Sequence, residues 1–148
     1  MTRHSHIRRS KGPQEIRLSI PSHLDKLRGV ERIAEEIAKV QCFSEDQRDN
    51  LCIAVTEAVG NAIVHGNRKD KSKKVHVTFR IDETTLRIEV QDEGRGFNPD
   101  LLSDPLDPEN VLKESGRGIF ILRSLMDEVD FRFGEQGTTV MFSMKLRK

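Results

Sequence analysis

The sequence predicts an α+β domain of two layers, in which a mixed, mostly antiparallel sheet is covered by helices on one face. Two segments with helical periodicity follow each other directly, and two predicted hairpins stand apart from them, so the predicted elements run β-α-α-β-β-loop-α-β-β. Helices and hairpins segregated along a chain are typical of α+β folds, whereas parallel sheets need strands and helices that alternate. At 148 residues the chain is long enough for one domain with a single core.

The first predicted strand and helix occupy the N-terminal part of this domain. Residues 14–20 alternate apolar and polar side chains, which predicts a strand with one buried face. Pro21 and Ser22 follow, and we expect Ser22 to cap a helix whose apolar residues recur at helical spacing from Leu24 to about Val40.

The second predicted helix begins after Ser44, because Ser44 and Gln47 form the signature of a capping box. It is expected to run to about Gly66 and Asn67, which are typical of a helix end. A short charged turn then leads into the first hairpin.

Both hairpins are predicted from a change to two-residue periodicity. The first hairpin spans 75–81 and 86–90, and the second spans 128–133 and 138–146. Between them, residues 93–115 are rich in Gly and Pro and poor in periodic apolar positions, and a loop of this length inside a compact domain is usually functional or mobile. Helical periodicity resumes over 116–126.

Composition excludes several classes of protein. With 25 Lys+Arg and 24 Asp+Glu, the net charge of +1 gives no general electrostatic reason for nucleic-acid binding. The sequence has no apolar run of the roughly 20 residues that a membrane span needs and no signal-peptide core. The 2 cysteines lack the spacing of a zinc site or a disulfide framework. We therefore expect a cytoplasmic protein, with a flexible basic arm over 1–12 and the folded domain over 13–148.

Glu57, Asn61 and His65 are spaced four residues apart on the second predicted helix, so they are expected to form one polar ridge among small apolar residues. A Glu carboxylate can act as a general base, and the carbonyl oxygen of an Asn side chain is a hard ligand suited to Mg²⁺. The alternative is that internal backbone groups satisfy Glu57 and Asn61.

Three later motifs could hold a ligand. DEGRGF at 92–97 places Asp92 at a strand end, before two glycines that leave the backbone open to a flat or phosphorylated ligand. SGRGI at 115–119 opens a helix, where free amide groups and glycines suit a phosphate. GTT at 137–139 offers a hydroxyl at a strand start. Each motif alone is also explained by an ordinary turn or helix start.

In their order, Glu57-x-x-x-Asn61, DEGRGF, GRGI and GTT resemble the ATP-binding domain of the gyrase–Hsp90–histidine-kinase–MutL (GHKL) superfamily over about residues 15–146. Within that superfamily, EAVGNAIVHGN at 57–67 and GRGIFILRSLMDEV at 116–129 resemble the small, stand-alone serine/threonine-protein kinases that act as anti-sigma factors. The resemblance implies a Bergerat-type ATP-binding fold, which is a two-layer α/β sandwich.

The resemblance also implies a role for each matching residue. Asp92 would accept a hydrogen bond from the adenine amino group, Asn61 would coordinate Mg²⁺ between the phosphates, and Glu57 would be the general base. Residues 98–115 would form a lid over ATP. The nucleotide-binding residues expected on this basis are Asn61, Asp92, Gly94, Gly96, Gly116, Arg117, Gly118, and either Thr138 or Thr139 through its hydroxyl.

The function implied is an ATP- and Mg²⁺-dependent protein serine/threonine kinase that binds a sigma factor and phosphorylates a small anti-sigma factor antagonist, as a homodimer. Partner contacts are expected on the first helix, particularly at Arg28 or Arg32, and both residues also fit an ordinary solvated helix face. A histidine kinase is disfavoured because the 56 residues before Glu57 leave no room for a helical hairpin with a phosphoacceptor histidine. Two alternatives remain: a nucleotide-gated partner-binding module of the same fold without significant kinase activity, and a structural domain whose glycines serve turns.

Overall fold

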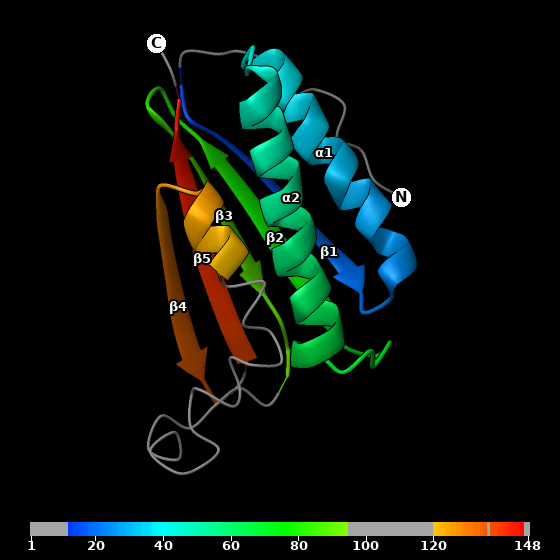
Figure 1. Cartoon of the computed structure of the whole chain (residues 1–148). Helices are drawn as coiled ribbons and strands as arrows, with labels where there is room; N and C mark the ends of the chain where they lie inside the picture. The colour runs from blue at the N-terminus through cyan, green and yellow to red at the C-terminus, as the bar shows by residue number, and fades with distance from the viewer. Residues whose placement is uncertain (1–11, 95–119, 136, 147–148) are drawn as a thin grey trace.

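A five-stranded antiparallel sheet forms one layer of the molecule, and helices cover one of its faces (Figure 1). This computed structural model describes residues 12–94, 120–135 and 137–146. The strand order is β1-β2-β3-β5-β4, and every pairing is antiparallel. The strands are β1 (Gln14–Pro21), β2 (Lys74–Ile81), β3 (Thr85–Gln91), β4 (Glu128–Gly134) and β5 (Gly137–Lys145).

The helical layer contains a short 3₁₀ turn, two α-helices and a π-helical turn. These are η1 (Leu24–Lys26), α1 (Leu27–Val40), α2 (Glu45–Asn61) and η2 (Ala62–Gly66). Residues 120–125 are also helical. None of the helices in the described ranges combines the length and apolar character that a membrane crossing requires.

The two predicted helix caps have opposite outcomes. The capping box of α2 is confirmed, because Gln47 N donates to Ser44 Oγ at 3.1 Å and Ser44 N donates to Gln47 Oε1 at 2.9 Å. The prediction that Ser22 caps the first helix is wrong. The side chain of His23 caps η1 instead, and Ser22 Oγ donates a hydrogen bond to the backbone oxygen of Lys73 at 2.7 Å.

The core lies between the helices and the face of the sheet that they cover. Alternate residues of β2, β3 and β5 point into it, and α1 and α2 each bury one apolar face against them. Leu51, Val55 and Val59 of α2 are fully buried, as is Phe79 at the centre of β2. Burial of each such side chain contributes about 1.5–3 kcal/mol, so α2 is held firmly over the sheet.

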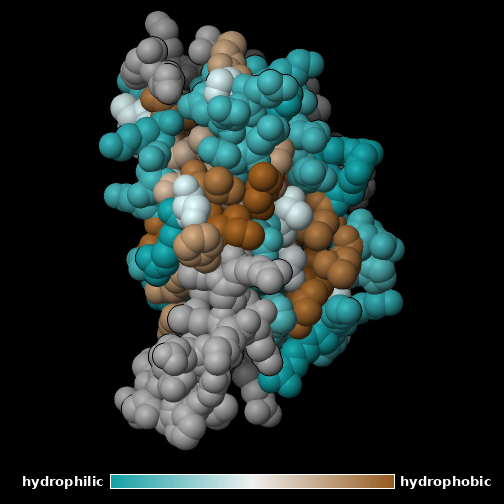
Figure 2. Space-filling model, viewed as in Figure 1, coloured by the Kyte–Doolittle hydropathy of each residue, from teal (hydrophilic) through white to brown (hydrophobic). Residues whose placement is uncertain are grey.

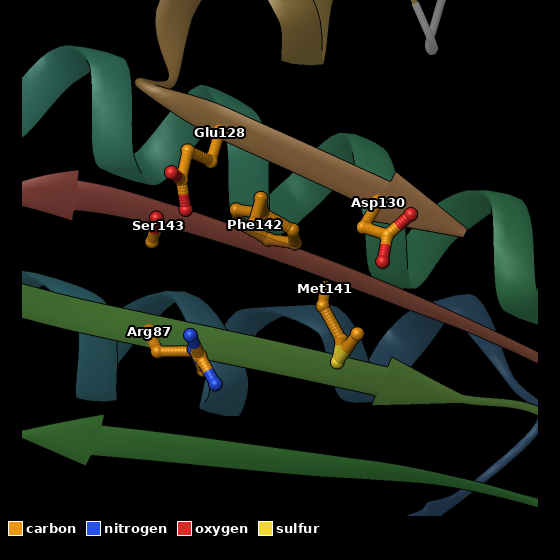
Figure 3. Close-up of a pocket in the computed structure, with 6 residues that line it drawn as sticks. All are labelled: Arg87, Glu128, Asp130, Met141, Phe142 and Ser143. Atoms are coloured by element: carbon orange, nitrogen blue, oxygen red, sulfur yellow. The ribbon is translucent and has the colours of Figure 1, made fainter. Parts of the chain in front are cut away.

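The other face of the sheet is polar, and no helix of the described residues covers it. It holds a pocket that is lined by Arg87, Glu128, Asp130, Met141, Phe142 and Ser143, from β3, β4 and β5 (Figure 3). No predicted nucleotide-site residue lines this pocket.

Apolar patches interrupt the mostly hydrophilic surface on the helical side of the molecule (Figure 2). The large exposed hydrophobic residues of the described ranges are Leu24, Ile53 and Phe120. Ile53 lies four residues before Glu57 on α2, so the two side chains share one side of the helix. That side of α2 carries the first predicted functional residues.

Candidate nucleotide site

Glu57 and Asn61 lie on the partly exposed side of α2, one helical turn apart. Both side chains are half-buried, and neither has a hydrogen-bond or ion-pair partner within the described ranges. Within the described residues, backbone groups therefore do not satisfy the polar atoms of Glu57 and Asn61, contrary to the alternative considered from the sequence. A carboxylate and a carboxamide left unpartnered beside each other remain available to a ligand.

The helix changes type immediately after Asn61. Residues Ala62–Gly66 form the π-helical turn η2, in which Asn67 N donates to the backbone oxygen of Ala62, five residues earlier, at 2.8 Å. Such turns are rare and frequently lie at functional sites. Glu57 and Asn61 lie within the regular α-helix, so they are neighbours on one side of it, as predicted. The wider turn interrupts the α-helical periodicity that would place His65 in line with them, and His65 is exposed.

Asp92 continues the helix-facing side of β3, one residue beyond the strand end. Its side chain is buried at 5% exposure. Its Oδ1 atom accepts hydrogen bonds from Gly94 N and Thr138 N, each at 3.0 Å. No donor to Oδ2 exists among the described residues, so this buried carboxylate keeps one oxygen free to accept a hydrogen bond from a ligand.

Three glycines make room for Asp92. A Cβ on Gly66 would overlap Asp92 Oδ2, and a Cβ on Gly94 would overlap the backbone oxygen of Gly66. A Cβ on Gly137 would overlap the backbone oxygen of Asp92, and the φ of Gly137 is +140°, which side-chain-bearing residues rarely adopt. Of these, Gly94 was predicted as a site residue, whereas the roles of Gly66 and Gly137 were missed.

Burial raises the pKa of Asp92, because it disfavours the charged form of the carboxyl. The N–H groups of Thr138 and Gly94 and the charge of Lys73 act in the opposite direction. An additional N–H donor at Oδ2 would therefore stabilise a carboxylate that the protein alone leaves partly uncompensated.

The two threonines of the GTT motif lie on opposite faces of the sheet. Thr138 pairs with Phe133 and precedes the buried Val140 by two residues, so it lies on the helix-covered face with Asp92. Thr139 pairs with Gln91 and lies on the open face. The sequence left both candidates open, and the alternation of β5 favours Thr138.

Several predicted residues lie outside the described ranges. They are the arm up to residue 11, the lid over 98–115, and the nucleotide-binding candidates Gly96, Gly116, Arg117 and Gly118.

The donor set of this region fits a magnesium ion that is held mainly by its substrate. The described residues contain no cluster of three or more His, Cys, Asp or Glu side chains. Mg²⁺ usually takes one or two protein ligands, with substrate phosphates and waters as the others. The carboxamide of Asn61, which has no polar partner among the described residues, can supply one such oxygen ligand.

Comparisons with known proteins identify the family of this chain. The family described as the histidine kinase-like ATPase domain matches residues 20–144. This chain belongs to that family. Among its curated relatives are the serine-protein kinases RsbW of Bacillus licheniformis and Bacillus subtilis (strain 168). The first is 35% identical, with 76% of this chain and 73% of the relative covered. The second is 29% identical, with 88% and 85% covered.

A solved structure shows the same fold at lower identity. It is a crystal structure of the RsbU and RsbW domains of Rv1364c from Mycobacterium tuberculosis, with a TM-score of 0.66 at 19% identity. The match covers 90% of this histidine kinase-like ATPase chain and 32% of the solved chain. The fold predicted from the GHKL resemblance is thus confirmed.

Proposed function

We propose that this protein is an ATP- and Mg²⁺-dependent serine/threonine-protein kinase that acts as an anti-sigma factor. One observation carries the proposal: within the described residues, the buried carboxylate of Asp92 has one oxygen without a donor, beside the turn that follows Asn61, and Glu57 and Asn61 on α2 have no polar partner. In a chain of the histidine kinase-like ATPase family, these features fit the two ends of a bound ATP.

The adenine end of the nucleotide lies at Asp92. Oδ2 accepts a hydrogen bond from the exocyclic amino group, while Gly94 N and Thr138 N hold Oδ1. The hydroxyl of Thr138 contributes a second contact from the same face of the sheet. This arrangement selects adenine over guanine or hypoxanthine, because neither of those bases carries an amino group at that ring position.

The phosphate end lies at α2. Asn61 would hold Mg²⁺ through its carboxamide oxygen, and the ion would supply the charge that neutralises the phosphate chain. Glu57 accepts the proton of the acceptor hydroxyl as the oxygen attacks the γ-phosphorus. The new O–P bond forms on the serine or threonine, and the bond to the β-phosphate oxygen breaks, with ADP as the leaving group.

The partners proposed are a sigma factor and a small antagonist protein that is the phosphorylation substrate. Supporting this, the curated relatives are serine-protein kinases RsbW, and the antagonist would need an exposed serine or threonine. Arg28 and Arg32 are exposed on α1, where they can serve partner contacts. A homodimer and a cytoplasmic location stay predictions from the sequence.

The test is phosphoryl transfer from labelled ATP to candidate antagonist proteins with Mg²⁺ present, for the wild type and for Glu57→Gln. The variant is expected to bind ATP normally and to lose about 100-fold or more of the transfer rate, the usual contribution of a general base. Glu83→Gln is the matched control, because Glu83 is an exposed glutamate in the turn between β2 and β3, at the opposite end of β3 from Asp92 and outside α1.

Equal transfer by the wild type and Glu57→Gln would remove Glu57 as the base. Tight ADP binding without transfer to any antagonist would favour the nucleotide-gated partner-binding module. The absence of any adenine-nucleotide binding would reject both functions.

A further inference from the structure

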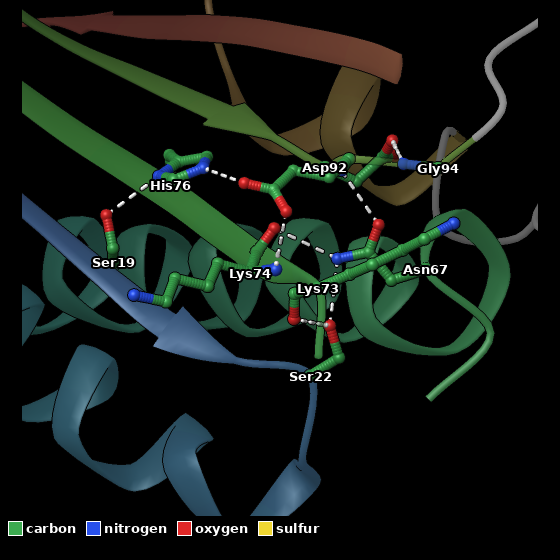
Figure 4. A network of polar contacts seen from close by, with 9 residues as sticks. Ser19, Ser22, Asn67, Lys73, Lys74, His76, Asp92 and Gly94 are labelled. Atoms are coloured by element: carbon green, nitrogen blue, oxygen red, sulfur yellow. Dashed lines mark hydrogen bonds and ion pairs between the residues drawn. The ribbon is translucent and has the colours of Figure 1, made fainter. Parts of the chain in front are cut away.

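The side chain of Asn67 makes three hydrogen bonds near the site, whereas the sequence placed this residue only at a helix end and in the family-like stretch 57–67. It is 2% exposed. Its Nδ2 donates to Ser22 Oγ at 2.8 Å and to the backbone oxygen of Lys74 at 3.0 Å, while its Oδ1 accepts from Glu93 N at 2.8 Å (Figure 4). Lys74 O can only accept and Glu93 N can only donate, so the orientation of the carboxamide is unambiguous.

These three bonds join the ends of three strands. Ser22 follows β1, Lys74 begins β2, and Glu93 lies just beyond the end of β3. Through its own backbone, Asn67 is attached to η2 by the bond to Ala62 O. One side chain therefore fastens the helical layer to the sheet at the end of the molecule where Asp92 lies.

The bond to Glu93 acts on Asp92 through adjacent residues. Gly66 and Asn67 lie side by side with the segment 92–94: Gly66 contacts the carboxylate of Asp92, and Asn67 holds the next backbone amide. Because the loss of a part-buried hydrogen bond of this kind is costly, Asn67 fixes the position of Asp92 relative to η2.

The Glu93 side chain gives the same segment a second attachment. Its Oε1 accepts from Lys74 N at 3.0 Å, and its Oε2 lies 2.7 Å from Nε2 of His76. His76 Nδ1 lies 2.7 Å from Ser19 Oγ. These hydrogen bonds are exposed, so they reinforce the position of Glu93 without replacing the part-buried hydrogen bond from Glu93 N to Asn67.

We infer that Asn67 is a positioning residue that sets the place of the Asp92 carboxylate and thereby the selectivity of the site for adenine. The adenine part of this inference rests on the proposed function. The positioning part does not, because it concerns the protein's own hydrogen bonds.

The test compares Asn67→Ala and Asn67→Ser with Ser22→Ala. Both Asn67 variants remove the bond to Glu93 N, because the serine side chain is too short to reach it. The serine variant keeps a hydroxyl in the cluster. Ser22→Ala is the matched control: it removes one bond of Asn67 and the bond to Lys73 O, but it leaves the bond to Glu93 in place.

The first readout is the ratio of the affinities for ADP and IDP, the inosine nucleotide that lacks the amino group, measured by calorimetry. We expect this ratio to fall about tenfold in Asn67→Ala and Asn67→Ser, the loss expected for a misplaced hydrogen bond to a charged group. Ser22→Ala should keep the wild-type ratio even if its melting temperature falls.

The second readout is hydrogen exchange of the Gly94 and Thr138 amides in the nucleotide-free protein. Both amides donate to Asp92 Oδ1, so both should exchange at least about tenfold faster in the Asn67 variants than in Ser22→Ala. This readout judges the positioning of Asp92 without any nucleotide. A wild type that fails to prefer ADP over IDP would therefore count against the proposed adenine contact alone.

Unchanged exchange at both amides in a folded Asn67 variant would overturn the inference. If such a variant kept the wild-type ratio of the affinities for ADP and IDP, the proposed role of Asn67 in adenine selectivity would be overturned. Failure of both Asn67 variants to fold would overturn it as well, since the side chain would then serve the fold as a whole.

Discussion

The backbone of Gly66 lies directly against the carboxylate of Asp92, so close that a Cβ on Gly66 would overlap Asp92 Oδ2. This contact joins the last residue of η2 to the residue that follows β3. Oδ2 is the carboxylate oxygen that receives no hydrogen bond from the described residues, and a side chain at position 66 would overlap it. The proposed adenine contact thus depends on a glycine in another layer of the fold.

Substitution of Gly66 by alanine should therefore damage both stability and nucleotide binding. The added methyl group must displace Asp92 Oδ2, and overpacking of this kind typically costs about 1–3 kcal/mol in the free energy of unfolding. We expect the ADP affinity of Gly66→Ala to fall more than about tenfold. Urea denaturation and ADP titration measure the two effects.

Gly29→Ala provides the control for that experiment. Gly29 lies within α1, and a Cβ there would meet no atom of the described residues within 4 Å. Alanine should stabilise the helix by up to about 1 kcal/mol and leave ADP binding unchanged. Wild-type ADP affinity in Gly66→Ala would contradict the assignment of Asp92 Oδ2 to the nucleotide.

Asp92→Asn should weaken ADP binding by about tenfold or more, because it replaces a charged acceptor by a neutral amide. A thermal shift assay would report this as a smaller rise in melting temperature at saturating ADP. Asp49→Asn is the control, because Asp49 is exposed on α2, and its melting temperature should rise with ADP as much as that of the wild type.

The raised pKa of Asp92 also predicts a pH dependence. Burial raises the pKa above its ordinary value of 3.8, so the folded protein binds the proton more tightly than the unfolded chain does. The stability that the protonated Asp92 carboxyl contributes is fully present below pH 3.8, and it is lost as the pH rises through the pKa of Asp92 in the folded protein. Over that range, the nucleotide-free Asp92→Asn variant should lose less stability than the wild type. ADP affinity of the wild type should rise over the same range.

Thr138 and Thr139 offer an internal comparison, since they are neighbours on opposite faces of β5. Thr138→Val should lower the ADP affinity several-fold, because the loss of one hydroxyl hydrogen bond costs about 1 kcal/mol of binding free energy. Thr139→Val should leave it unchanged. Calorimetry on the two variants decides the matter, and the reverse order of effects would place the nucleotide on the open face of the sheet.

The two cysteines should differ sharply in reactivity. Burial raises the pKa of the Cys52 thiol to about 11, and the nearby Glu35 and Glu31 add to this effect. Cys42 is exposed. Because the thiolate is the reactive form, alkylation near neutral pH followed by mass spectrometry should label Cys42 much faster. Comparable labelling rates would contradict the burial of Cys52 against α1.

Most of the fold was predictable because its signals are local. The two-residue periodicity of the hairpins and the capping box at Ser44 each depend on residues close together in the sequence, and both were confirmed. The prediction for Ser22 was wrong because the partners of this residue are distant in the sequence. A serine after a proline is typical of a helix cap, but Ser22 bonds to Lys73 and Asn67, about 50 residues away.

The site was only partly predictable for the same physical reason. The choice between Thr138 and Thr139 depends on the register of β5. Asn67 bonds to the ends of three strands, and these ends come together only in the folded chain. The pairing of Asn and Gly after a helix does signal a helix end, which is why a buried anchor was missed there.

The π-helical turn also limits how this protein can change in length. In a regular α-helix each residue advances the chain by about 100° around the axis. Deleting one residue from Ala62–Gly66 would tighten the turn and swing Asn67 by about that angle, away from the three strand ends that it joins. Variation by insertion or deletion should therefore be far better tolerated in the charged turn over 68–73 than in the five residues before it.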